Sequence, residues 1–222
     1  MSGMRAARMA ALCLALVALS GCARLGGVFS GSVPEDSRNA SPAASAASGA
    51  ERPSLLPLLS PEGERKLMEA RSLWIEDDCV EPERATLLLD AVLEEVPDYA
   101  DALIWRGKAL TAQGYLEDAF DDLTMAVRLL PGGGQPEGAR LRARAYAARA
   151  YTALRMAREQ GAERDLASAL EADPSEPTAY LYRGALEFLR GKDAEGCADL
   201  GRACELGMCG ARQQAESGGL CR

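Results

Sequence analysis

The sequence contains no histidine, so imidazole is unavailable as general base, catalytic-triad member or metal ligand. Basic residues are also scarce, with 25 Lys plus Arg against 33 Asp plus Glu and a net charge of -8. Because phosphate binding needs a clustered positive surface, we exclude nucleic acid as a partner. The remaining composition, 48% hydrophobic and 26% charged residues, is that of a globular protein and not of a chain disordered throughout.

Sequence patterns typical of enzymes are missing as well. The glycine run 132–134 precedes neither a GK[ST] sequence nor a strand, so it is interpreted as a loop and not as a phosphate-binding turn. Two adjacent acidic pairs, Asp77–Asp78 and Asp121–Asp122, are expected on the solvated surface, because neighbouring positions do not face each other across a cleft. We therefore predict that the protein is not an enzyme and has no catalytic residue, cofactor, metal site or small-molecule substrate.

The first 21 residues have the pattern of a signal peptide. Arg5 and Arg8 precede an apolar run from Met9 to Leu19. This run is too short to cross a bilayer, which takes about 20 residues, but it fits the apolar region of a secretory signal. The sequence LSGC at 19–22 resembles the lipobox of bacterial lipoproteins.

The lipobox resemblance implies cleavage before Cys22 and acylation of that residue. Three acyl chains are more than the two signals needed for stable anchoring, so the protein is expected to be attached to a membrane without spanning it. The second residue after cleavage is Ala23 and not the Asp that resembles an inner-membrane retention signal. By this resemblance the lipid anchor lies in the outer membrane, on its periplasmic face.

Residues 22–61 are expected to form a flexible linker that begins at the lipidated cysteine. They consist mainly of Ala, Ser, Gly and Pro and show no hydrophobic period. Such a segment buries too little apolar surface to offset its chain entropy. The folded part, expected at 62–222, therefore stands off from the membrane.

An internal repeat with a period of 34 residues follows the linker. Pro97 and Pro131 lie 34 positions apart, and Pro174 lies 43 positions further on, a longer step that matches an insertion at 134–142. Three copies place small residues at intervals of 12, 7 and 5. These positions are Gly107, Ala119, Ala126 and Pro131; Ala150, Ala162, Ala169 and Pro174; and Gly184, Gly196, Ala203 and Met208.

The repeat resembles the tetratricopeptide repeat (TPR), in which two antiparallel helices approach closely where each presents a small side chain. The resemblance implies an all-α, right-handed α-solenoid of about four helix pairs with a short C-terminal capping helix. The first copy is degenerate, with its first helix expected near Leu67–Ile75 and a longer turn at 77–82. An alanine-rich bundle whose spacing is accidental is the alternative. The expected repeats are about 66–99, 100–133, 143–176 and 177–210, and the cap is 209–222.

The resemblance also implies a partner-binding groove lined by the first helix of each pair. Its lining is aromatic and aliphatic, which suits an amphipathic helix or an extended apolar peptide. Lys108 and Arg155 are expected to be polar anchors. Because the repeats contain no Asn, a clamp for a C-terminal carboxylate is not predicted. Packing between repeats is the alternative for each aromatic residue. The predicted groove residues are Ile104, Trp105, Lys108, Tyr151, Arg155, Leu181, Tyr182 and Phe188.

Four cysteines lie in the last 26 residues, where the open end of a solenoid needs a cap. The periplasm is oxidising, so disulfides are expected. Cys197 and Cys204 are seven positions apart on one helix, about 10.5 Å along its axis and beyond disulfide reach. A short helix over about 209–217 that folds back antiparallel would bring other pairs together. The predicted pairs are Cys197 with Cys221 and Cys204 with Cys209, and Cys79 is left free.

Two functions are compatible with these patterns. The first is a lipid-anchored periplasmic scaffold or assembly factor that binds a protein or peptide at the outer membrane. The second is a tethered thiol or metal-binding protein that uses the C-terminal cysteines. Those cysteines are spaced by 7, 5 and 12 positions and lack the closely paired thiols of a zinc site or a C-x-x-C redox motif, which favours structural disulfides.

Overall fold

The computed structural model describes residues 58–130 and 136–221. The predicted signal peptide, the lipidation site Cys22, most of the linker and the glycine run at 132–134 lie outside the described residues. Within the two described ranges, no helix combines the length and the apolar character needed to cross a membrane.

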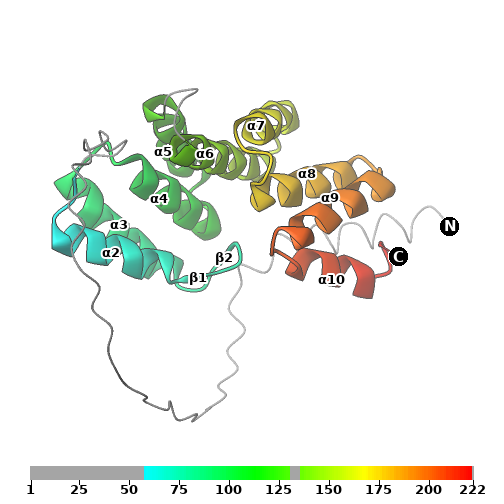
Figure 1. The fold of residues 1–222 in the computed structure, drawn as a ribbon, viewed down its shortest axis with the longest axis horizontal. Helices are drawn as coiled ribbons and strands as arrows, with labels where there is room; N and C mark the ends of the chain where they lie inside the picture. Colours follow the sequence, from blue (N-terminus) through cyan, green and yellow to red (C-terminus); the bar gives the residue numbers. More distant parts are fainter. Residues whose placement is uncertain (1–57, 131–135, 222) are drawn as a thin grey trace, which may run out of the picture.

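Four helix pairs and one further helix make up most of the described residues. Consecutive pairs pack on one another in a curved array, with α2 and α3 at one end and α10 at the other (Figure 1). This confirms the predicted all-α helical repeat and its C-terminal capping helix. The pairs are α2 (Pro61–Arg71) with α3 (Pro82–Glu95), α4 (Ala100–Gln113) with α5 (Leu116–Leu129), α6 (Pro136–Arg155) with α7 (Glu159–Ala172), and α8 (Pro177–Leu189) with α9 (Asp193–Glu205), followed by α10 (Gly210–Ser217).

Small residues let the two helices of a pair lie against each other. A Cβ atom added at Gly107 would lie 2.6 Å from Cγ of Leu123 and 3.2 Å from the carbonyl oxygen of Ala119. At Gly184 the added atom would lie 3.1 Å from the carbonyl oxygen of Gly196. Bulk at these positions would therefore push the helices apart. The alanines of the repeat are fully buried, at 0% exposure: Ala119, Ala126, Ala150, Ala162, Ala169 and Ala203.

An ion pair that the sequence analysis missed recurs in three of the four repeats. In each, an Arg that precedes the small residue of the first helix donates two hydrogen bonds of 2.7–2.8 Å to an Asp 16 positions later. The Asp side chains are only 12–13% exposed, so water screens the pairs poorly. The pairs are Arg106–Asp122, Arg149–Asp165 and Arg183–Asp199.

The recurrent pair corrects one surface prediction and gives a test. Asp122 is held by Arg106, whereas its neighbour Asp121 is exposed as predicted. We expect Asp122→Ala to lower the free energy of unfolding by about 2 kcal/mol, because it leaves a partly buried guanidinium short of its main partner. The matched variant Asp121→Ala should change it by less than about 0.5 kcal/mol. Equal effects of both substitutions in urea denaturation would contradict a stabilising role for the pair.

The first repeat departs from the prediction in its turn. Its first helix does not continue to Ile75 but ends at Arg71, where the backbone N–H of Ser72 bonds to carbonyls of the last turn. The chain then forms a two-stranded hairpin, β1 (Trp74–Ile75) and β2 (Asp78–Cys79). Glu76, at the tip, has a φ of 53°, which turns the chain back on itself.

The insertion before the third repeat also has a different form. It lengthens the first helix of a repeat that was expected to begin near residue 143, so α6 begins at Pro136. Proline at the first helical position is favoured because its missing N–H would have had no partner there. From this extension Arg142 donates to the carbonyl oxygen of Leu130 at 3.1 Å, which ties α6 to the end of α5.

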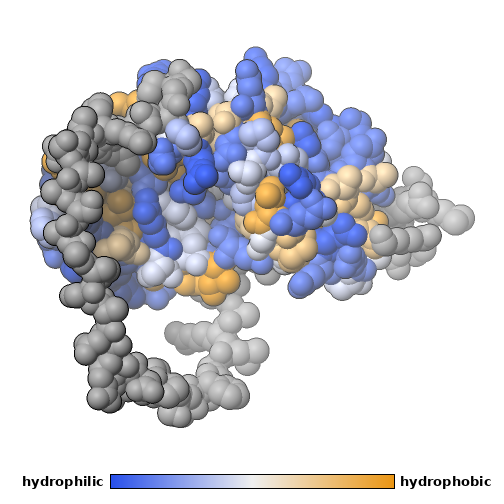
Figure 2. All heavy atoms as spheres, viewed as in Figure 1, coloured by the Kyte–Doolittle hydropathy of each residue, from blue (hydrophilic) through white to orange (hydrophobic). Residues whose placement is uncertain are grey.

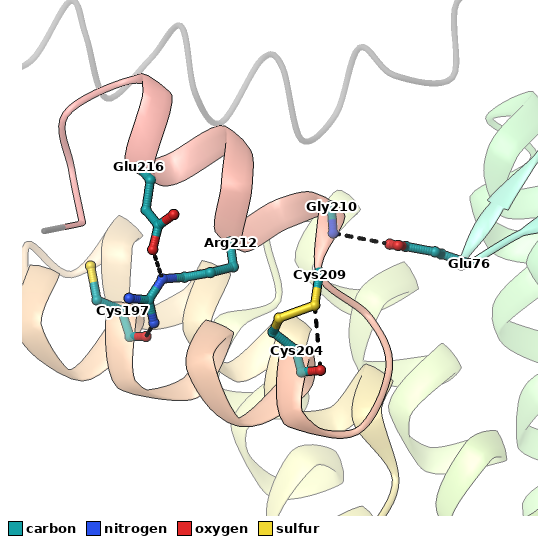
Figure 3. The surroundings of a disulfide bond; sticks show 7 residues. All are labelled: Glu76, Cys197, Cys204, Cys209, Gly210, Arg212 and Glu216. Atoms are coloured by element: carbon teal, nitrogen blue, oxygen red, sulfur yellow. Dashed lines mark hydrogen bonds and ion pairs between the residues drawn. A yellow bond between two sulfur atoms is a disulfide. The ribbon is translucent and has the colours of Figure 1, made fainter.

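The C-terminal cap is fastened as the sequence predicted. The Sγ atoms of Cys197 and Cys221 lie 2.02 Å apart, and those of Cys204 and Cys209 lie 1.95 Å apart. Helix α10 lies along α9, and Arg212 reaches across to the carbonyl oxygen of Cys197 at 3.4 Å (Figure 3). Two disulfide bonds therefore fasten the cap to the last repeat.

Candidate functional site

A pocket of about 350 Å³ lies between the β1–β2 hairpin, the first helices of three repeats and the cap. Helices α4, α6 and α8 form its floor, because one face of each first helix remains free after the second helix has packed on the other. Figure 1 shows the hairpin in the gap between α2 and α10. The lining includes Trp74, Glu76, Asp77, Asp78, Cys79, Lys108, Ala112, Ala148, Tyr151, Leu181, Tyr182, Ala185, Met208 and Gln214.

Two stacked tyrosines from neighbouring repeats form part of the pocket wall. The rings of Tyr151 in α6 and Tyr182 in α8 are nearly parallel, at 9°, with centroids 4.6 Å apart. Arg155 donates to the hydroxyl of Tyr151 at 3.5 Å and to the carbonyl oxygen of Thr111 at 3.4 Å. Burial raises the pKa of Tyr151, so its hydroxyl stays neutral at ordinary pH. The wall is thus aromatic and uncharged on this side.

The hairpin places carboxylates in the pocket lining beside the tyrosine wall. Asp77 accepts a hydrogen bond of 2.6 Å from Lys108 Nζ and a second one from the hydroxyl of Tyr182. The side chains of Asp77 and Lys108 are each only 11% exposed. The prediction that Asp77 lies on the solvated surface is therefore wrong, because the hairpin folds inward onto α4 and α8.

A third contact joins the hairpin to the cap. The carboxylate of Glu76 accepts from the backbone N–H of Gly210 at 3.3 Å, across 134 positions of sequence (Figure 3). Gly210 follows Cys209, so the disulfide between Cys204 and Cys209 lies directly beside this contact. The hairpin thus bridges the first repeat and the last, and it closes the groove into a pocket.

The pocket lining carries an excess of negative charge. It contains the carboxylates of Glu76, Asp77 and Asp78, and a single cation, Lys108, which Asp77 already binds. Burial, followed by the charges of Asp77 and Glu76, raises the pKa of Asp78. The charge of Lys108 offsets part of this rise, so the ammonium group of Lys108 acts on Asp78 as well as on Asp77.

Beneath the hairpin lies a cluster of two tryptophans and three cations. The rings of Trp74 and Trp105 meet edge to face at 4.8 Å between centroids. Lys108 Nζ lies 4.5 Å from the Trp105 centroid, and the guanidinium groups of Arg144 and Arg71 lie at 5.6 and 6.0 Å. The contacts of Trp74 with Trp105 and Lys108 join the hairpin to α4.

The overall likeness of the helical array to solved structures settles its fold. TTC0263, a TPR protein from Thermus thermophilus, superposes with a TM-score of 0.51 and 23% sequence identity, over 65% of this chain and 74% of that one. The chain has the fold of a tetratricopeptide repeat protein. MamA from Desulfovibrio magneticus RS-1 aligns at 16% identity over 68% of this chain and 78% of that one, with a TM-score of 0.47. No protein-family model matches the sequence, and no curated protein does.

Within this tetratricopeptide fold, half of the predicted groove residues come together. Four of them line the pocket: Lys108, Tyr151, Leu181 and Tyr182. Arg155 lies behind the tyrosine wall and Trp105 lies under the hairpin, so both support the pocket from outside its lining. The expected polar anchors are engaged internally, Lys108 by Asp77 and Arg155 by the hydroxyl of Tyr151.

Two predicted groove residues are wrong because they belong to the core of the tetratricopeptide array. Ile104 has 0% exposure, since it packs among the residues of the first two repeats. Phe188 is 3% exposed, because the cap covers it and its ring fills the space above Gly196. A groove position assigned from the repeat pattern alone takes no account of the residues that pack on Ile104 or Phe188.

The hairpin and cap residues of the pocket were missed altogether. The one available signal was the long turn after residue 71, which interrupts the repeat and carries Asp77, Asp78 and Cys79. Nothing in a periodic pattern indicates that such a turn folds onto the repeats. On the face drawn in Figure 2, apolar surface occurs in separate patches among hydrophilic ones. Ile75 in the hairpin and Val80 directly after it are exposed.

The four C-terminal cysteines are paired in two disulfides. All four C-terminal cysteines are in disulfides, so none offers a thiolate to a metal. In the described part of the chain, no three Cys, Asp or Glu side chains are grouped closely enough to hold a metal ion.

Cys79 lines the pocket, and the reactivity of its thiol depends on pH. Burial is the main cause that raises the pKa of its thiol to about 11. The neutral thiol is favoured, so its contribution to stability is full below the pKa of the unfolded chain and is lost as the pH rises towards 11. At pH 8 we expect alkylation of Cys79 to be about 100-fold slower in the folded protein than in urea. Equal rates, measured by mass spectrometry of the Cys79 peptide, would contradict its burial.

Proposed function

We propose that the protein is a non-enzymatic interaction scaffold, attached by lipid to the periplasmic face of the outer membrane, that binds a peptide segment of another protein. One observation carries the proposal: three repeats, a hairpin and a cap converge on one pocket with an aromatic wall and carboxylates. Pockets of this size with a few convergent polar groups are typical of binding sites. The residues that line it include no activated nucleophile with an adjacent base.

Two further observations support the proposed location. The lipobox-like sequence at 19–22 and the preceding apolar run are the pattern of a lipoprotein signal. Two disulfides fit a protein that folds in an oxidising compartment such as the periplasm. Replacing Cys22 by Ser should abolish labelling by palmitate and move the protein from the membrane to the soluble fraction. Continued labelling of the variant would contradict lipidation at this residue.

The binding role can be tested by crosslinking in the cells that make the protein. The chain offers adjacent glutamines on α10: Gln214 lines the pocket, whereas Gln213 is exposed outside it. A photoreactive benzoylphenylalanine at position 214 should give a discrete adduct that the same group at 213 does not give. Mass spectrometry would identify the bound peptide segment. Identical adduct patterns at the two positions, or none at 214, would contradict a partner in the pocket.

A further inference from the structure

We infer that the pocket receives a cationic side chain, an arginine or lysine, from the peptide segment that it binds. This inference rests on the proposed scaffold function and specifies the chemistry of the partner. It differs from the expectation from sequence, in which the groove supplied the cations and the partner was apolar.

The aromatic walls are the first part of the case. Trp74 comes from the hairpin, and Tyr151 and Tyr182 come from the helices, so aromatic rings line the pocket from two sides. A cation is attracted to the negative face of an aromatic ring, and the attraction grows when water is excluded. An aromatic-walled pocket of this kind stabilises a guanidinium or an ammonium group more than a neutral side chain of the same shape.

The protein's own Lys108 shows how the pocket holds a cation. Its ammonium lies 2.6 Å from the carboxylate of Asp77, 4.5 Å from the centroid of Trp105 and 5.8 Å from that of Trp74. The seat for one cation is therefore a carboxylate combined with aromatic rings. The pocket lining also includes the carboxylates of Asp78 and Glu76 and the rings of the two tyrosines.

The carboxylates of Asp78 and Glu76 are not neutralised within the described residues. Glu76 accepts from the backbone N–H of Gly210, which carries no charge, and Asp78 forms no ion pair in the described ranges. Lys108 is bound to Asp77 and acts on Asp78 only through its charge, so the lining keeps more negative than positive charge. Electrostatic complementarity therefore calls for a positively charged occupant.

The apolar lining and the pocket size select an amino-acid side chain over a metal ion. Ala112, Leu181 and Met208 offer surface for the methylene groups of an arginine or lysine, whose charged end would reach the carboxylates. A volume of about 350 Å³ is at the lower end for small-ligand sites, so one or two side chains enter and not a long helix. Within the described parts of the chain, no carboxylate and thiol cluster suits a metal ion.

The test compares two capped tripeptides that differ only in charge. The probes are acetyl-Gly-Arg-Gly-amide and its citrulline analogue, in which an uncharged urea group replaces the guanidinium. NMR titration of the oxidised protein follows the signals of Tyr182 and Gln214. We expect saturable shifts with the arginine peptide and about tenfold weaker binding of the citrulline peptide, as for loss of one partly desolvated cation contact. Raising the salt concentration should weaken the binding of the arginine peptide and leave the binding of the citrulline peptide unchanged.

Variants that each remove one charge show which carboxylates contribute to binding of the arginine peptide. Asp78→Asn and Glu76→Gln should each weaken arginine binding several-fold, since Gln at 76 keeps an acceptor for the Gly210 N–H while losing the charge. Glu83→Gln removes the same charge from an exposed position outside the pocket and should change nothing. NMR spectra of both pocket variants that resemble the wild-type spectrum would establish that the variants fold.

The outcomes separate this inference from the proposed function. Equal binding of the two peptides, binding of neither, or no effect of both pocket variants overturns the cationic partner. Saturable shifts of the same signals by calcium chloride alone overturn it in favour of a metal site. The scaffold function is decided separately by the Gln214 and Gln213 crosslinks, which do not depend on the charge of the partner.

Discussion

Replacing Gly107 by Leu is expected to lower the free energy of unfolding by about 3 kcal/mol, a large fraction of the stability of a domain this size. Even a Cβ atom at this position would overlap Leu123 Cγ, at 2.6 Å, and press on the carbonyl of Ala119. Helices α4 and α5 would have to move apart. Because α4 forms part of the pocket floor, the pocket would be disturbed as well. Urea denaturation followed by circular dichroism measures the change.

Gly161 provides a matched control for this substitution. It also lies in a helix of the array, α7, but a Cβ added there would meet no atom within 4 Å. Gly161→Leu should therefore be neutral or stabilising by up to about 1 kcal/mol, because Leu favours the helix more than Gly does. If the two substitutions had the same effect, close helix contact at Gly107 would not be what stabilises the repeat.

The second large effect is expected at the cap. Removing the disulfide between Cys197 and Cys221, with both changed to Ala, should cost about 3 kcal/mol, because this bond closes a loop over 24 positions. Removing the bond between Cys204 and Cys209, which spans 5 positions, should cost about 2 kcal/mol or less. The longer bond also keeps Cys221 against Phe188 in the last part of the core.

Denaturation of the two double variants under oxidising conditions tests this order. Wild-type protein treated with a reducing agent should lose at least as much stability as the variant lacking the longer bond. A variant without the Cys197 and Cys221 bond that unfolds at the wild-type urea concentration would show that the cap is held by packing alone.

Periodic features of the structure could be predicted from the sequence. Gly107, Ala119 and Ala126 mark where helices touch, because close approach requires small side chains whatever the neighbouring sequence is. The cysteine pairs followed from the reach of a disulfide and the length of a helix. An Arg and an Asp 16 positions apart also recur at fixed positions in three repeats. The same periodic pattern could have predicted this pair, but it was missed.

The contents of the groove could be predicted only in part. Tyr151 and Tyr182 were placed correctly because each lies on the free face of the first helix of its pair, beside the small residue Ala150 or Gly184. Ile104 and Phe188 were misplaced because their exposure depends on which neighbour covers them, and the cap covers Phe188.

The hairpin could not be predicted because its contacts are non-periodic and distant in sequence. Asp77 meets Tyr182 across 105 positions, and Glu76 meets Gly210 across 134. The sequence showed only that the first repeat is irregular. The conversion of an apolar groove into an acidic pocket depends on this one segment, so the charge expected of the partner changes with it.

Nuclear Overhauser effects between the hairpin and α8 would test the closed pocket most directly. In the oxidised protein, the ring protons of Tyr182 should show cross-peaks to the hairpin residues Asp77 and Asp78, and the amide of Gly210 should show them to the side chain of Glu76. A hairpin with no cross-peaks to α8 or α10 would mean that the groove is open and that its carboxylates do not form the pocket.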